Sequence, residues 1–78
     1  MIADTLSRVV ALVRDVYGTA QPIAADTALD ALDGDSLGRV LLVIEVEKDF
    51  GVRVPRLAEE QWRTVADIVA AVEKARGA

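Results

Sequence analysis

Apolar residues recur at spacings of three and four along the first part of the chain. They are Ile2, Leu6, Val9, Val10, Val13, Val16 and Tyr17. This period is typical of an amphipathic helix that buries one apolar stripe. Gly18 follows the last of these positions, and glycine is the residue that most often ends a helix. The pattern therefore predicts a first helix over residues 4–17.

Residues 18–35 lack this period and are predicted to form a long loop. Pro22 disfavours helix at the residue before it, and the pairs Asp26-Thr27 and Asp33-Gly34 are typical of turns and caps. The apolar residues that we expect to pack on the core are Ile23, Ala28, Leu29 and Leu32. A structureless segment of this length is uncommon and is usually functional.

A second helix is predicted over residues 36–50, with Asp35 or Ser36 as its cap and Gly51 at its end. The predicted core face consists of Leu42, Val43, Val46 and Phe50. A neighbouring face carries Leu37, Val40, Leu41 and Ile44, ringed by Arg39, Glu45, Glu47 and Lys48. An exposed apolar patch with a charged ring usually marks an interaction site. This face is therefore either a partner surface or a surface that the 18–35 loop covers.

The last third of the chain predicts one short helix and one long helix. Residues 52–54 alternate briefly before Pro55 and are interpreted as an extended connector, followed by a helical turn within 57–62 that Trp62 packs onto the core. The sequence from Thr64 to Asp67 resembles a capping box. The final helix is expected over about 65–76, on an apolar stripe made by Val65, Ile68, Val69 and Val72.

Together these elements predict an all-α fold, a small four-helix bundle of three long helices and one short one. A chain of 78 residues is long enough for a single domain over 1–78. A chain of this size buries only about 60% of its unfolded surface, so its core is small.

Composition narrows the possible chemistry. The chain contains no cysteine and no histidine, which excludes disulfides, thiolate metal sites, thiol catalysis and a Ser-His-Asp triad within the chain. We therefore expect a protein that is not itself an enzyme. An EF-hand loop that binds calcium has glutamate at its twelfth position. Counted from Asp26 or Asp30, the twelfth residue is Leu37 or Leu41, so neither segment fits such a loop. No metal site is expected.

Charge and hydropathy indicate the kind of partner. The net charge is −4, which argues against nucleic acid and favours proteins with positive patches. The longest aliphatic run is Val40 to Ile44, far short of the roughly 20 residues of a membrane span, and the first residues lack the pattern of a secretory signal. A cytoplasmic monomer without membrane contact is expected.

Asp35-Ser36-Leu37 is the strongest candidate site. Serine and aspartate at this position can be a plain helix cap. The start of a helix is also a favourable place for a phosphate group, because free backbone N–H groups and the helix dipole point there. From capping alone, both interpretations stay open.

The order and spacing of these residues resemble the acyl carrier proteins. The resemblance lies in Leu32-Asp33-Gly34-Asp35-Ser36-Leu37 and in the segment from Leu42 through Phe50-Gly51 to Pro55, and it covers nearly the whole chain. It implies that Ser36 is esterified by the 4′-phosphopantetheine of coenzyme A, installed by a phosphopantetheinyl transferase whose magnesium Asp35 supports. The arm would carry acyl groups as thioesters to acyl-loading and chain-processing enzymes with basic patches. The implied docking surface is Leu37, Val40, Leu41, Ile44, Glu47 and Lys48.

Some positions depart from the fatty-acid carriers of this family. Gly38 and Leu41 stand where those carriers usually have acids, and Arg39 adds a positive charge. These departures point to a specialised pathway, such as polyketide synthesis, rather than housekeeping fatty-acid synthesis. A peptidyl or aminoacyl carrier is an alternative cargo class. A helical adaptor that is never modified is an alternative of another kind.

Overall fold

The computed structural model describes residues 4–32, 36–55 and 57–77, with only the backbone described for Ser36 and Glu59. Its three long helices are α1 (Thr5–Tyr17), α2 (Ser36–Phe50) and α4 (Val65–Ala75). Shorter elements are the single helical turn α3 (Ala58–Gln61) and the 3-10 turn η1 (Leu29–Leu32). The described segments contain no strand, only one isolated antiparallel bridge between Ala28 and Thr64. The predicted all-α fold is confirmed, and the helix count is confirmed in part, because η1 adds a turn that the sequence did not predict.

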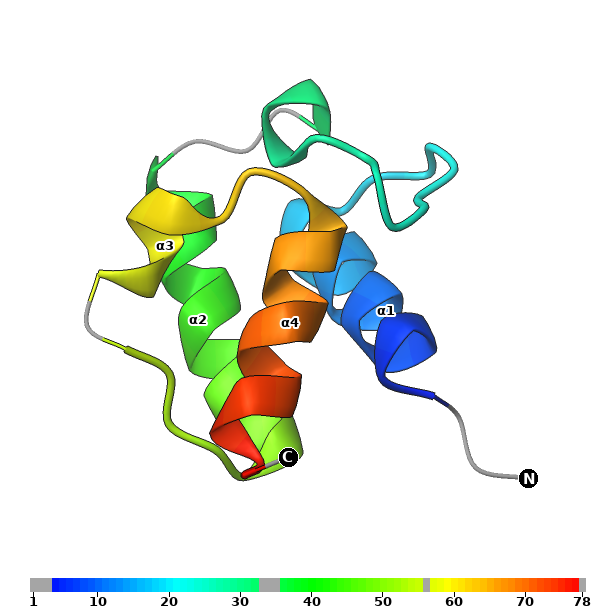
Figure 1. The fold of residues 1–78 in the computed structure, drawn as a ribbon. Helices are drawn as coiled ribbons and strands as arrows, with labels where there is room; N and C mark the ends of the chain where they lie inside the picture. Colours follow the sequence, from blue (N-terminus) through cyan, green and yellow to red (C-terminus); the bar gives the residue numbers. More distant parts are fainter. Residues whose placement is uncertain (1–3, 33–35, 56, 78) are drawn as a thin grey trace.

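The three long helices pack around a common core, with α1 in contact with both α2 and α4 (Figure 1). The short α3 lies against α2. Among the residues whose side chains are described, eleven buried apolar side chains form the core: Val9, Val13, Leu29, Leu32, Leu42, Val46, Ala58, Trp62, Val65, Ile68 and Val72. The predicted core face of α2 is confirmed, since Leu42 and Val46 are fully buried while Val43 and Phe50 are partly buried against this cluster.

The first helix is bounded by its caps. Asp4 accepts a hydrogen bond from the backbone N–H of Ser7 at 2.7 Å, which satisfies one of the donors left open at a helix start. Gly18 closes the helix with a φ of 62°, a left-handed conformation that costs glycine little. The predicted helix over 4–17 is therefore confirmed, with Asp4 as its cap.

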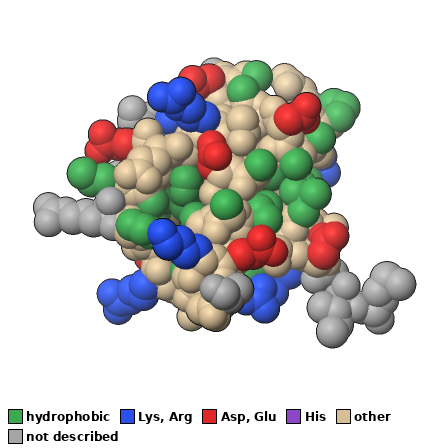
Figure 2. All heavy atoms as spheres, viewed as in Figure 1, with side chains coloured by type: hydrophobic (Ala, Val, Ile, Leu, Met, Phe, Trp, Pro, Cys, Tyr) green, Lys and Arg blue, Asp and Glu red, His purple; other side chains and the backbone are tan. Residues whose placement is uncertain are grey.

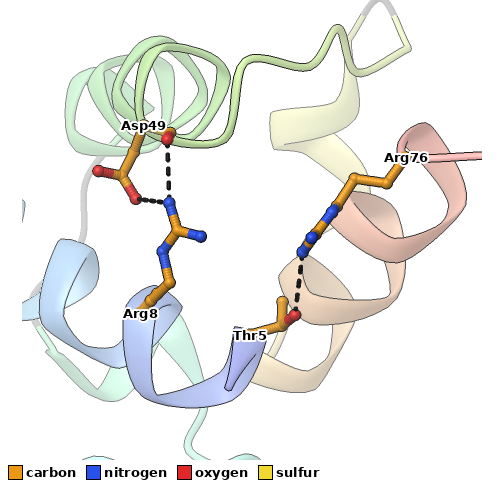
Figure 3. A network of polar contacts seen from close by, with 4 residues as sticks. All are labelled: Thr5, Arg8, Asp49 and Arg76. Carbon is orange, nitrogen blue, oxygen red and sulfur yellow. Dashed lines mark hydrogen bonds and ion pairs between the residues drawn. The ribbon is translucent and has the colours of Figure 1, made fainter. Parts of the chain in front are cut away.

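Polar contacts join α1 to α2 and α4 at one end of the bundle (Figure 3). The Arg8 guanidinium donates to the backbone oxygen and to Oδ2 of Asp49, both at 3.0 Å, and lies 4.2 Å from the centre of the Phe50 ring. Arg76 of the α4 C-terminus reaches Thr5 Oγ1 at 3.4 Å. Because Arg8 combines an ion pair with a stacked aromatic ring, it orients the end of α2 relative to α1.

The connection from α2 to α4 is extended at first and then helical. Gly51 ends α2 with a φ of 67°, and residues 52–55 form no strand, as predicted. Leu57 then adopts a φ of 65°, which is uncommon for leucine, at the start of α3. Trp62 is buried directly after α3, which confirms that it packs the short helix onto the core.

The start of α4 has the predicted capping box. The Asp67 carboxylate accepts hydrogen bonds from the backbone N–H groups of Arg63 at 2.8 Å and Thr64 at 3.1 Å, and the Thr64 side chain reciprocates. These hydrogen bonds lower the pKa of Asp67 below the usual carboxyl value, and the bond from the Arg63 N–H has the largest effect. A short acid at this position thus completes the box as glutamate would.

Replacing Asp67 with asparagine is expected to lower the free energy of unfolding at neutral pH by about 0.5–1 kcal/mol, since the neutral amide interacts less well with the helix start. The folded-state pKa of Asp67 lies below the unfolded value, so its contribution is fully present above pH of about 4 and is lost as pH falls through the lowered pKa. Urea titrations of the wild-type and Asp67→Asn proteins at several acidic pH values measure this loss of stability. A difference in unfolding free energy between them that persists well below the lowered pKa would contradict the role of the Asp67 carboxylate in the cap.

None of the helices in the segments described above is long and apolar enough to cross a membrane.

Candidate functional site

The long loop that leads to Ser36 is held against the junction of α3 and α4. Backbone hydrogen bonds join Leu29 N–H to the Arg63 carbonyl and Ala66 N–H to the Ala25 carbonyl, both at 2.8 Å. Leu29 and Leu32 are buried, so the prediction that the loop packs on the core is confirmed for them, while Ile23 is partly buried against it. The prediction was wrong for Ala28, which is exposed, and whose backbone pairs with that of Thr64.

Ser36 is the first residue of α2, and α2 runs to Phe50 as predicted. Asp33, Gly34 and Asp35 lie outside the described residues, so the predicted support of the transferase magnesium by Asp35 stays a prediction. The buried Leu32 comes four residues before Ser36. The chain is therefore fixed to the core shortly before the serine and enters a helix at the serine.

The apolar face of α2, made of Leu37, Val40, Leu41 and Ile44, is exposed. The four side chains are 65%, 43%, 45% and 47% exposed, respectively. The described part of the loop, residues 18–32, leaves these four side chains exposed, so the interpretation that the loop covers this face is wrong for that part of the loop. The role of the face as a partner surface stays a prediction. A large aliphatic patch that begins beside the serine is left open to solvent, as interaction surfaces often are.

Two of the four charged residues predicted to ring this face have contacts within the chain. Arg39 forms an ion pair with Asp30 of η1, and its side chain is only 18% exposed. Glu47 Oε2 accepts a hydrogen bond from the backbone N–H of Val54 at 2.9 Å. Lys48 is exposed. The roles predicted for Glu47 and Lys48 in partner binding stay predictions, whereas the Arg39 charge is balanced by a neighbour.

The start of α2 is a favourable place for a negatively charged group. Among the residues that the structure describes, no cluster of His, Cys, Asp or Glu is arranged to hold a metal ion. The first turn of α2 offers backbone N–H groups without helical acceptors and the positive end of the helix dipole. The phosphodiester that the resemblance implies on Ser36 is negatively charged, and that end of a helix favours such a group.

A groove of about 620 Å³ lies between α4, α3 and the connector before α3, away from α2. Apolar side chains such as Val54, Trp62 and Ala71 line it, together with Arg53 and Lys74. Figure 2 shows hydrophobic side chains on this face of the molecule with basic ones beside them. The small side chains of the valine- and alanine-rich chain are compatible with a cleft, but the sequence does not indicate that it lies beside the alanines of α4.

The chain is similar to known carrier proteins in sequence and in fold. The family described as "Phosphopantetheine attachment site" matches residues 7–72. The solution structure of the oxytetracycline acyl carrier protein superimposes with a TM-score of 0.75 at 28% sequence identity, over 99% of this chain and 86% of that one. The sequence similarity therefore includes Ser36, and the fold similarity extends over nearly the full length.

Proposed function

Because the chain belongs to the acyl carrier protein family, whose members bear covalent 4′-phosphopantetheine, we propose that its attachment residue is Ser36. The thiol at the end of the arm would hold acyl intermediates as thioesters and present them to biosynthetic enzymes. The observation that carries the proposal is the position of Ser36 at the first residue of α2, beside the exposed apolar face.

The composition supports a carrier rather than a catalyst. The chain lacks cysteine, and the arm supplies the thiol that a thioester needs. It also lacks histidine, so the proton transfers of loading and chain extension belong to the partner enzymes. The role of the chain's own residues is to hold the serine at a helix start and to offer a docking face next to it.

The pathway that we propose is polyketide synthesis or a related specialised route. Two observations support it: the similarity to the oxytetracycline carrier, and an α2 surface with few acids. The family match favours a modified carrier over an unmodified adaptor. A peptidyl carrier differs in cargo, and loading the arm with malonyl or aminoacyl groups would distinguish it.

The partners that we propose are a phosphopantetheinyl transferase and the enzymes that load and process the acyl chain, with the carrier acting as a monomer. The net charge of −4 is the ground for expecting basic patches on those enzymes. That expectation stays a prediction. It concerns how the partner approaches, because the long-range electrostatic field of a protein steers its diffusional encounter with a partner.

Intact-mass measurement tests the carrier function. The apo protein is incubated with coenzyme A, magnesium and a broad-specificity phosphopantetheinyl transferase. We expect the mass to rise by one phosphopantetheine group, and only one, because the chain offers one serine at the start of α2. An unchanged mass, with helical circular dichroism confirming the fold and a known carrier modified in parallel, would overturn the proposal.

A further inference from the structure

The groove between α3, α4 and the connector before α3 is an elongated trough. Its α4 side is formed by Asp67, Ala70, Ala71, Lys74 and Ala75, at alternating spacings of three and one. These residues lie on one side of the helix, and from 67 to 75 the helix rises by about 12 Å. None of the lining residues that the structure describes belongs to α2.

The groove carries positive charge in a chain whose net charge is −4. Arg53 of the connector and Lys74 of α4 both line it, both are exposed, and neither forms an ion pair with any residue that the structure describes. The acid among the described lining residues is Asp67, whose carboxylate already accepts two backbone N–H groups at the start of α4. The groove therefore favours an anionic ligand, whereas the charge of the whole chain disfavours one.

The fold accounts for Lys74 but not for Arg53. Lys74 lies in the last turn of α4, where a cation stabilises the negative end of the helix dipole. Arg53 lies two residues beyond Gly51, outside the last turn of α2, and the effect of the dipole falls off beyond that turn. The two cations thus belong to two different walls of the groove, whose apolar lining includes Val54 and Ala71.

The groove is open to solvent. Among its lining residues Pro55, Gln61 and Ala70 are exposed. Small molecules bind mainly in sites that enclose most of their surface. An open groove about two helical turns long instead fits the apolar side of a short amphipathic helix. Its volume of about 620 Å³ has room for a few apolar side chains of such a helix.

We propose that this groove docks a short acidic amphipathic helix of a partner protein. The apolar side chains of that helix would lie on the alanines of α4 beside Val54, and its acidic side chains would pair with Arg53 and Lys74. Because α2 does not contribute to the described lining, such a partner would leave the start of α2 free. The inference goes beyond the carrier function and applies equally to the chain without its arm.

Trp62 reports on occupation of the groove, because it lines the groove and is the only tryptophan of the chain. The probe is a capped peptide of about 11 residues, with leucines at i, i+3, i+4 and i+7 and glutamates beside them, titrated into the apo chain. We expect a saturable change in Trp62 emission with a Kd below about 1 mM. A matched peptide with glutamine in place of glutamate should bind at least about fivefold more weakly. Unchanged emission, or equal affinities of the two peptides, would overturn the inference.

Substitutions of single cations locate the peptide. Arg53→Gln and Lys74→Gln should each weaken binding of the acidic peptide by about two- to fivefold, as expected for exposed ion pairs. The matched control Lys48→Gln removes an exposed cation of α2 and should change the Kd by less than about 1.5-fold. Equal losses for Lys48→Gln and Lys74→Gln would show that the peptide responds to overall charge and does not lie in the groove.

The same titration followed by NMR tests other occupants and other sites. We expect the amide shifts of Ala70 and Ala71 to change. Shifts confined to Leu41 and Ile44 would place the peptide on α2 and refute the inference. Decyl sulfate, used below its micelle concentration, is the small-molecule probe. If it changes Trp62 emission and the acidic peptide does not, the groove is a small-molecule site and the inference is wrong.

The mass measurement with coenzyme A separates this inference from the proposed function. A chain that gains the arm but does not bind the acidic peptide is a carrier without this docking groove. A chain that binds the peptide in the groove but gains no arm has the docking groove, and only the carrier function fails.

Discussion

Replacing Ser36 with alanine is expected to abolish the mass gain with coenzyme A and transferase completely. The substitution removes the oxygen that would form the phosphodiester while leaving the start of α2 in place. Ser36 is the first helical residue, where serine and alanine differ by only roughly 0.5 kcal/mol in helix propensity, so the free energy of unfolding should hardly change. The loss of modification would therefore occur in a folded protein, and intact mass with circular dichroism measures both.

The chain offers a matched control in Ser7, the only other serine. Ser7 lies in the first turn of α1, where its backbone N–H donates to Asp4. Ser7→Ala should gain the arm at the wild-type rate, because Ser7 lies in α1 and not at the start of the helix with the exposed apolar face. A Ser36→Ala protein that still gains mass would show that another hydroxyl bears the arm and that the site is misassigned.

Leu42→Ala should destabilise the protein far more than any of the substitutions on its surface. Leu42 is fully buried in the middle of α2, and truncating such a leucine typically lowers the free energy of unfolding by about 2–5 kcal/mol, partly by leaving a cavity. A domain of this length has a total stability of only about 4–12 kcal/mol. The variant should therefore unfold at a much lower urea concentration, and urea titration followed by circular dichroism measures the change.

The neighbouring residue supplies the control for this comparison. Leu41→Ala removes the same atoms from the exposed side of the same helix, so its cost should stay below about 1 kcal/mol. The contrast between adjacent leucines tests the rotation of α2 about its own axis. Equal losses for both variants would mean that the core face and the apolar face are assigned to the wrong sides.

The backbone of α2 was predictable from the sequence because its signals are local. Ser36 and Gly51 bound the helix, and the spacing of Leu42 and Val46 sets the buried side. The capping box of α4 was predictable for the same reason, since Thr64 and Asp67 are three residues apart. The acyl carrier fold followed from the order of these local elements.

The partners of charged side chains were not predictable, because they depend on where the loop runs. Nothing in the sequence around Arg39 indicates that it turns toward Asp30, or that Glu47 accepts from the Val54 backbone. The helical period also could not decide whether the loop covers the apolar face. That question depended on Leu29 and Leu32 anchoring the loop elsewhere.

The hydrogen bonds between the long loop and the start of α4 have a consequence for local unfolding. Leu29 donates to Arg63, while Val65 and Ala66 donate to Thr27 and Ala25, so each segment supplies acceptors to the other. Neither can detach without leaving the other's amides unsatisfied. We therefore expect the loop and the start of α4 to open as one cooperative unit, so that a change in the last helix also affects the loop before α2.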